Sequence, residues 1–431
     1  MTQPRSQKDR DDDVAPEIVR QRSVIRTERP SESPAAGSTG GKRLVGVDAA
    51  RGVALLGMMA IHSLYTSSPD GSPTWSHTVF SGRAAAAFAV LAGIGIAFMT
   101  GRRRVPPTMA RPTAAALAVR ALAIGVIGLS LGYTYAHLAA VILPYYAVMF
   151  LLAIPLVFLS TRTIAAIGAV TLVAAPVFSH TVRPYLPEPT HVNLTFGHLI
   201  DHPLEILTEL TFTGFYPAVP WMTYLCAGLV VGRLDLTSAR VAARLLCVGA
   251  GMAAAAAASS ALLVHEFGLK RILAAESARG MSANRTQELL TFGGEGTTPT
   301  STWWWLAVDA PHTSTPFDLL GTSGSAIALL GLMLLIGQVT APILGRLAAV
   351  VQAPLAAAGA MPLTLYTAHI AFINSRYDVF DATTGYLAQV AGVLLIGLVA
   401  RAAGRRRGPL EALVAGWVRQ ARHRYAVAPH T

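Results

Sequence analysis

Apolar residues recur along this chain in runs long enough to cross a lipid bilayer. A helix needs about 20 residues to span roughly 30 Å of hydrocarbon, and the runs are spread over most of the chain. They do not alternate between apolar and polar residues, so a transmembrane β-barrel is excluded. The pattern predicts an all-α, polytopic membrane helical bundle with about ten transmembrane helices. The ten runs cover residues 44–64, 79–100, 114–133, 137–159, 164–179, 217–233, 245–264, 320–337, 355–373 and 384–401.

The composition agrees with this pattern and separates the chain into three parts. Hydrophobic residues make up 53% and charged residues 13% of the 431 residues, with a mean hydropathy of +0.48. Soluble domains carry about 25% charged residues. Residues 1–42 are rich in Arg, Asp, Ser, Pro and Gly, so we expect a disordered cytoplasmic tail. Residues 43–415 form the predicted transmembrane domain, and residues 416–431 a second cytoplasmic tail.

Basic residues predict the orientation of the chain in the membrane. They cluster after the second, fourth, sixth, eighth and tenth runs, for example at Arg102–Arg104 and Arg405–Arg407. These connections lie on one side if both termini are cytoplasmic, as the positive-inside rule requires. The net charge of +11 is therefore explained by anionic lipid headgroups rather than by nucleic acid. We expect a multi-pass plasma-membrane protein with two long outer loops, 180–216 and 265–319.

Five ionisable residues are predicted to lie near the outer boundary of the membrane. His62 ends the first run and His77 precedes the second, while His312 and Asp318 precede the eighth run. His369 lies about two turns below the outer end of the ninth run. An imidazole titrates near neutrality and can act as a general base, acid or nucleophile. Each residue could instead be an interfacial side chain that bonds a carbonyl, so both interpretations stay open.

A charged pair opens the first run at the cytoplasmic side. Asp48 and Arg51 are spaced i, i+3 and share a helix face. The pair could simply position the end of the helix. Alternatively, Arg51 with nearby Lys42 and Arg43 could bind a phosphate-bearing ligand that arrives from the cytoplasm.

Weaker signals lie in the two long loops. His198 and His202 have a spacing that suits zinc, but Pro203 breaks the helix and no third ligand is indicated. The run Trp303–Trp305 could stack on a sugar ring or belong to an aromatic belt at the membrane surface. The two cysteines, Cys226 and Cys247, lie in different runs and indicate neither a disulfide framework nor a metal site.

Four short motifs resemble the transmembrane acyltransferase superfamily, which includes lysosomal heparan-α-glucosaminide N-acetyltransferase and bacterial YeiB-like proteins. Residues 48–58, Asp-Ala-Ala-Arg-Gly-Val-Ala-Leu-Leu-Gly-Met, resemble its first-helix signature. His77 followed by Ser81-Gly82 is similar to the active-site histidine followed by Asn-Gly. Residues 359–369 resemble a late Leu-x-x-Tyr-x-x-His helix, and residues 408–411, Gly-Pro-Leu-Glu, the YeiB-like ending. The chain departs from the family at His62, where Asn is frequent, and in a longer first loop.

This resemblance implies transfer of an acyl group, acetyl in the first instance, from cytosolic acyl-CoA to an extracytoplasmic glycan or lipid-linked acceptor. It implies that His77 deprotonates the acceptor or carries the acyl group, and no metal is expected. The residues assigned on this basis are His77, His369 and Asp318 for catalysis, His62, His312, Arg83 and Tyr366 for the acceptor, and Asp48 and Arg51 for the donor.

Two other classes of function compete with the acyltransferase. A small-molecule or glycan transporter or flippase would suit polar residues in broken helices, but its site belongs near the midplane at a repeat interface. A non-catalytic scaffold for envelope assembly would leave the histidines unexplained. The expected partners are membrane lipids and a glycan or lipid-linked acceptor, with no nucleic acid; a homodimer is compatible with the sequence.

Overall fold

The protein is described by a computed structural model that covers residues 44–427. This part of the chain is helical, and its β-structure amounts to one isolated bridge between Ser67 and Pro73. The predicted tail 1–42 lies outside the described residues. In chain order the α-helices are α1 (Val45–Ser63), α2 (Trp75–Phe80), α3 (Arg83–Met99), α4 (Ala110–Leu131), α5 (Leu143–Leu156), α6 (Thr161–Val182), α7 (Phe196–Asp201), α8 (Pro203–Thr208), α9 (Ala218–Gly232), α10 (Ala239–Leu262), α11 (Leu269–Ser277), α12 (Ala283–Phe292), α13 (Pro316–Ile336), α14 (Pro342–Ala358), α15 (Pro362–Ile373), α16 (Ala382–Ala402) and α17 (Pro409–Val427).

Short helical segments of other geometry complete the fold. Two π-helical segments continue regular helices, η3 (Glu209–Thr213) after α8 and η4 (Leu263–Gly268) after α10. Three short 3₁₀ segments are η1 (Pro107–Met109), η2 (Arg183–Tyr185) and η5 (Trp303–Ala307). The prediction of long loops at 180–216 and 265–319 is therefore wrong in part, because both segments contain short helices. These helices are only 6–10 residues long, so each offers too few turns for a helical period to be distinguished from a loop.

The predicted membrane bundle is confirmed. Within residues 44–427, seven helices are long and apolar enough to cross a membrane, and nine if two bent pairs each count as one span. The bent pairs are α8–η3 with α9, at 52°, and α14 with α15, at 71°. The fourth predicted run, 137–159, corresponds to α5, an apolar helix of 14 residues that is shorter than expected. The protein is thus a polytopic helical membrane protein.

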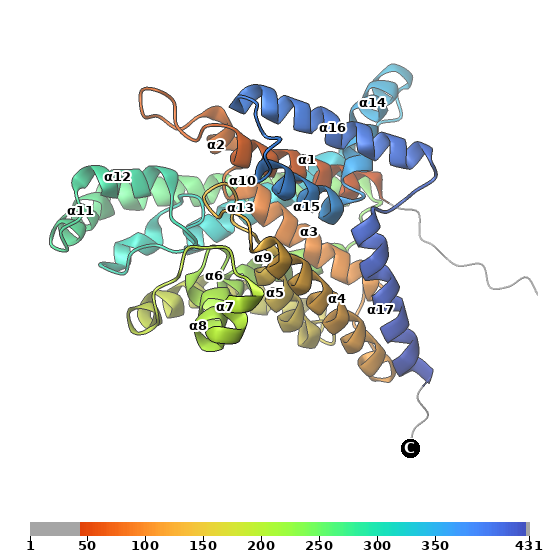
Figure 1. Cartoon of the computed structure of the whole chain (residues 1–431), viewed down its shortest axis with the longest axis horizontal. Helices are drawn as coiled ribbons and strands as arrows, with labels where there is room; N and C mark the ends of the chain where they lie inside the picture. Colours follow the sequence, from red (N-terminus) through yellow and green to blue (C-terminus); the bar gives the residue numbers. More distant parts are fainter. Residues whose placement is uncertain (1–43, 428–431) are drawn as a thin grey trace, which may run out of the picture. The chain divides into compact units, whose positions relative to one another are not determined.

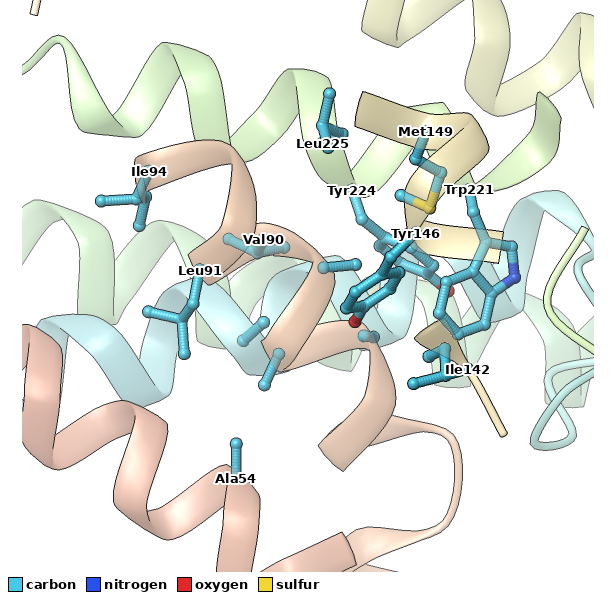
Figure 2. Packing of buried hydrophobic residues seen from close by; sticks show 14 of the residues in the cluster. Ala54, Val90, Leu91, Ile94, Ile142, Tyr146, Met149, Trp221, Tyr224 and Leu225 are labelled. Carbon is cyan, nitrogen blue, oxygen red and sulfur yellow. The ribbon is translucent and has the colours of Figure 1, made fainter. Parts of the chain in front are cut away.

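The core forms where small residues let helix backbones approach one another. In α3 and α9, a Cβ added to Gly228 would lie 2.0 Å from the carbonyl oxygen of Val90. In α10 and α13, a Cβ on Gly331 would lie 2.4 Å from the amide nitrogen of Leu246. In lipid the hydrophobic effect does not drive helices together, so close backbone contacts of this kind stabilise helix association instead. Figure 2 shows the larger side chains that fill the space around α3, including the aromatic pair of Trp221 and Tyr224.

Two peripheral regions complete the bundle. At one end, α11 and α12 lie side by side beyond α10 (Figure 1). At the other end α17 runs along α4, so the described part of the predicted tail 416–431 continues a packed helix. The connection from α15 to α17 is fixed by Glu411, whose carboxylate accepts hydrogen bonds from the amides of Leu363 and Thr364 at 2.7 and 3.1 Å.

Candidate functional site

Ionisable residues gather at both ends of the bundle. We call the end with His62, His77, His312 and His369 the histidine end, and the end with Arg51 the arginine end. At the histidine end α1 and α15 finish, while α2 and α13 begin. The alternating direction of the helices thus brings together four histidines that are far apart in the sequence.

The first pair of histidines is joined by direct contact. His62 Nδ1 lies 3.1 Å from His369 Nε2, and the two rings stack at 5.3 Å with an interplanar angle of 6°. His369 Nδ1 lies 2.6 Å from the amide oxygen of Gln389 in α16. Because that oxygen only accepts, His369 Nδ1 carries the proton, Nε2 accepts from His62, and His62 Nε2 is left as an acceptor. The pair fixes α1, α15 and α16 to one another.

His77 is buried without a hydrogen-bonding partner. Its side-chain environment leaves the residue only 6% exposed, and neither ring nitrogen has a partner within the described part of the chain. Its backbone amide donates to Thr74, which caps α2. Its ring packs edge-on against Phe292 at 5.2 Å between centroids. Buried polar atoms are almost always paired, so two unpaired ring nitrogens indicate a position prepared for a ligand.

Arg83 provides the positive charge beside His77. Its guanidinium donates to the carbonyl of Thr78 at 2.6 Å, which folds the side chain back over α2. Electrostatic interactions link Arg83 to His77, to Asp309 and to Asp318. The short link between α2 and α3 requires Gly82, whose φ of +69° suits glycine. Arg83 was assigned to the acceptor, and its position beside His77 is compatible with that role.

His312 sits in a strained turn that Asp318 holds. His312 and Ser314 have φ values of +55° and +51°, which are uncommon for residues with a side chain. Asp318 Oδ2 accepts from the amides of Thr313 and Ser314 at 3.2 and 2.9 Å, and Thr315 caps α13 by accepting from the Asp318 amide at 3.1 Å. Strain of this kind costs about 1–3 kcal/mol per residue and clusters at functional sites. Asp318 therefore shapes the turn, and no hydrogen bond joins it to a histidine within residues 44–427.

The state of His312 follows from its surroundings. Burial lowers the pKa of His312 to about 4, and nearby His77 contributes in the same direction. The imidazole is thus neutral near pH 7. Its ring packs edge-on against Tyr216 at 5.7 Å between centroids, and it interacts electrostatically with His62. His312 is thus close enough to interact with both His62 and His77.

A small cavity separates His62 from Tyr216 and Tyr366. Its volume is about 20 Å³, enough for one water molecule, which needs roughly 10–15 Å³. The Tyr366 hydroxyl accepts from the Ile142 amide at 3.3 Å, so this buried side chain also anchors the start of α5. Tyr366 was assigned to the acceptor, and the cavity is the surface that it shares with His62.

Sequence reasoning missed Asp309, which joins the histidine end from the loop before α13. It is half-buried and has no hydrogen-bonding partner among residues 44–427. Burial raises the pKa of Asp309 to about 6, although Arg83 acts in the opposite direction. A single acidic residue in a segment interpreted as loop gave no signal in the sequence.

The arginine end contains the ion pair that the spacing predicts. Arg51 Nη1 lies 3.0 Å from Asp48 Oδ1, and the Asp48 side chain is 6% exposed. The start of α1 packs closely against the bend between α14 and α15, where a Cβ on Gly359 would lie 1.8 Å from the Asp48 carbonyl oxygen. The pair is thus held rigidly between three helices.

A second arginine, Arg120, was also missed. It lies inside α4, interacts electrostatically with Arg51 and Glu411, and stacks over Phe150 at 5.2 Å. Both Arg120 and Arg422 reach Met99 at the end of α3, at its sulfur and its carbonyl oxygen. An arginine inside an apolar run is costly and marks function by default. That signal was present within the predicted run 114–133.

The weaker candidates are dispersed. His198 forms a capping box with Thr195 at the start of α7, and His202 lies beside Glu205 at 3.5 Å. No group of three or more His, Cys, Asp or Glu residues that could hold a metal occurs within residues 44–427. Residues of the tryptophan run have different partners. Trp303 packs on His180, and the indole of buried Trp305 donates to Glu276 at 2.8 Å.

A helical bundle with buried ionisable groups at both ends defines a membrane-embedded protein that handles polar ligands, the class that contains membrane transferases and transporters. A family model described as heparan-alpha-glucosaminide N-acetyltransferase, catalytic, matches residues 43–263. The chain belongs to this family and is a membrane-bound acyltransferase. No curated protein matches the chain. The match includes α1 to α10, with His62, His77 and Arg120, and ends before Asp309 and His312.

Proposed function

We propose that the protein moves an acetyl group from acyl-CoA, bound at the arginine end, to an amine or hydroxyl acceptor bound at the histidine end. The observation that carries this proposal is the buried imidazole of His77, whose two nitrogens lack protein partners. A ring in that state is available to a reacting group. The family match supplies the reaction class, acetyl transfer.

The donor site is built from Arg51 and Arg120. Two guanidinium groups within electrostatic range of each other favour a ligand with several negative charges, and Arg binds phosphate with a fork of parallel hydrogen bonds. Arg51 precedes His62 by eleven residues on α1, so a rise of about 1.5 Å per residue separates them by about 17 Å. The extended pantetheine arm of CoA covers a length of this order. Its thioester would reach toward His77 while the phosphates stay at the arginine end.

His77 acts on the proton that the acceptor must lose. In direct transfer, an unprotonated His77 nitrogen takes a proton from the acceptor, the acceptor atom bonds to the acetyl carbon, and the carbon–sulfur bond breaks. The imidazolium then returns the proton to the CoA thiolate. In the covalent route the imidazole attacks the thioester first, CoA leaves as the thiol, and the acceptor displaces the acetyl group from the ring.

Neighbouring residues set the surroundings of this step. Arg83 lies beside His77 and favours its neutral form, which is the form that a base or nucleophile requires. Neutral His312 interacts electrostatically with His77 and lies in the turn that Asp318 holds. The His62–His369 pair fixes the helices that frame the site and contributes an acceptor nitrogen to the small cavity.

The orientation follows the basic residues: both termini cytoplasmic, the arginine end inside and the histidine end outside, in the plasma membrane. With Cys226 and Cys247 replaced, a cysteine at Asn284 in α12 should react with an impermeant maleimide from outside. A cysteine at Arg103 should react only after the membrane is opened. The reverse pattern of labelling would put the donor site on the wrong face and contradict the proposal.

The activity is tested by thiol release from acetyl-CoA. The purified protein in proteoliposomes is given a panel of amino-sugar and sugar-alcohol acceptors, and we expect wild-type turnover with at least one amine acceptor. His77→Ala should abolish it, while His137→Ala, at an exposed histidine of the same end, should not. Transport of the same acceptors without thiol release, in wild type and His77→Ala alike, would replace the acyltransferase with a carrier.

A further inference from the structure

A larger cavity lies beside the histidine end. Its volume is about 310 Å³, and it lies between the last turns of α10 with η4, helix α12 and the loop before α13. Most of its lining residues follow residue 263, where the family match ends. A cavity built largely outside the matched part of the chain is suited to set the specificity of this particular protein.

One wall of the cavity is mainly apolar and belongs to a helix that faces lipid. Ala257, Ala261 and Val264 line it from α10 and η4, together with the polar side chains of Ser260 and His265. On the same helix Val248 and Leu262 are 58% and 60% exposed, as expected for side chains in contact with lipid tails. The π-helical turn η4 places Val264 in the lining, and such turns are frequent at functional sites. A ligand can therefore enter from the bilayer.

The opposite wall carries polar side chains beside the apolar Leu290 and Val308. Gln287 and Thr291 contribute from α12, and Asp309 contributes the carboxylate that has no hydrogen-bonding partner within residues 44–427. A carboxylate and an amide on one side of an apolar wall match a ligand with a polar head and an apolar tail. An amine on the head would satisfy Asp309.

The cavity and His77 both contact the end of α12. Thr291 lines the cavity, and the next residue, Phe292, ends α12 and packs on the His77 ring. Gly293 fixes this position, because its φ of +87° and its close approach to the Pro311 carbonyl leave no room for a side chain. The end of α12 thus connects the cavity to the imidazole.

We propose that this cavity binds the acceptor, and that the acceptor is a membrane-anchored amphiphile with an amine-bearing head, its tail lying along α10 and its amine facing Asp309. This inference rests on the proposed acetyl transfer, for which it names the acceptor class. A movement of the Phe292 ring would bring the amine to His77. Lateral entry from the lipid explains why the apolar wall belongs to an exposed helix.

The test is a binding measurement that requires no turnover. Dodecyl glucosaminide with a diazirine in its alkyl chain is photo-crosslinked to the protein in nanodiscs, and the modified peptides are mapped by mass spectrometry. We expect crosslinks within residues 257–264, displaced by excess unlabelled dodecyl glucosaminide but not by methyl glucosaminide.

Substitutions separate the cavity from the general lipid surface. Ala261→Trp fills the cavity and should reduce the displaceable crosslinking at least about tenfold. Ala258→Trp, exposed on the same helix outside the cavity, is the matched control and should retain it. Asp309→Asn should weaken binding while the protein stays folded.

Three results would overturn the inference. They are equal crosslinking in Ala261→Trp and wild type, displaceable crosslinks on other helices instead of α10, and displacement by methyl glucosaminide at the same concentration, which would indicate a soluble acceptor. We expect His77→Ala to bind the probe like wild type. The crosslinking result therefore does not depend on whether His77 catalyses acetyl transfer.

Discussion

The two ends of the bundle differ in the kind of ionisable group that they carry. At the arginine end, guanidinium groups are permanently charged and bind helix carbonyls: Arg104 donates to Phe158 at 2.7 Å and Arg233 to Leu159 at 2.9 Å. Cations at helix C-termini are favourable there. At the histidine end the groups are imidazoles that can change charge, and His77 has no partner. Under the proposed function, the arginine end holds a negatively charged ligand and the histidine end moves a proton.

Substitutions at the histidine end and at the arginine end should therefore affect different kinetic quantities. Loss of a group that acts only in the transition state lowers kcat, whereas loss of a binding contact raises KM or Kd.

The largest effect is expected at His77. His77→Gly should lower turnover by about 10²–10⁴-fold, the typical contribution of a positioned general base. Thermal stability should fall only modestly, because the change removes the contact with Phe292 and places a glycine in α2 but breaks no side-chain hydrogen bond. Added imidazole should restore part of the rate by occupying the space that the His77 side chain leaves. Thiol release measured against imidazole concentration tests this, and a variant that is fully active without imidazole would remove His77 from the mechanism.

Arg120 and Arg51 should give the next largest effect. A hydrogen bond to a charged group is worth about 1.5–3 kcal/mol, so Arg120→Gln or Arg51→Lys should weaken acyl-CoA binding roughly tenfold to a hundredfold. Isothermal titration with a non-hydrolysable acyl-CoA measures this. Arg346→Gln, at an exposed arginine early in α14, is the control. Unchanged affinity in Arg120→Gln and Arg51→Lys would make both arginines structural.

The pH dependence of acceptor binding should follow Asp309. Its pKa is raised to about 6 by burial, so the carboxylate gains a proton as the pH falls below 6 and loses its attraction for an amine. Binding of dodecyl glucosaminide should weaken by roughly tenfold between pH 7 and 5. Arg83, Asp318 and cavity-lining His265 also face this region. Asp309→Asn should flatten the profile; a variant that keeps the slope would assign it to another of these groups.

The smallest effect is expected at His62. His62→Asn retains a donor for His369 but loses the stacked ring, and a neutral hydrogen bond contributes about 1 kcal/mol. Turnover should fall by less than about tenfold. A loss of turnover as large as that of His77→Gly would indicate that the His62–His369 pair, rather than His77, carries out the proton transfer.

The helical bundle was predictable because each membrane span carries its own signal. Runs of apolar residues identify α1, α3 and α13 without knowledge of their neighbours. The Asp48–Arg51 pair was predictable for the same reason, since both residues lie within one turn of a helix. The local pattern also indicated the start of α13, because Thr315 followed three residues later by an acidic residue is a cap signature.

The assembled site was not predictable, because it depends on contacts between distant segments. His62 and His369 are separated by 307 positions, and nothing in either segment specifies the other. Asp309 gains its role only when α10, α12 and α13 converge. Arg120 is the exception: an arginine inside an apolar run was a visible signal, and its cost in lipid should have marked it.

The division of labour between the two ends is tested most directly by measuring acyl-CoA binding and turnover on the same two variants. We predict that His77→Ala binds non-hydrolysable acyl-CoA with wild-type affinity and does not release thiol from acetyl-CoA. Arg120→Gln should bind it weakly and approach the wild-type kcat at saturating donor. The opposite pattern, with donor affinity lost in His77→Ala or kcat lost in Arg120→Gln at saturation, would contradict the account.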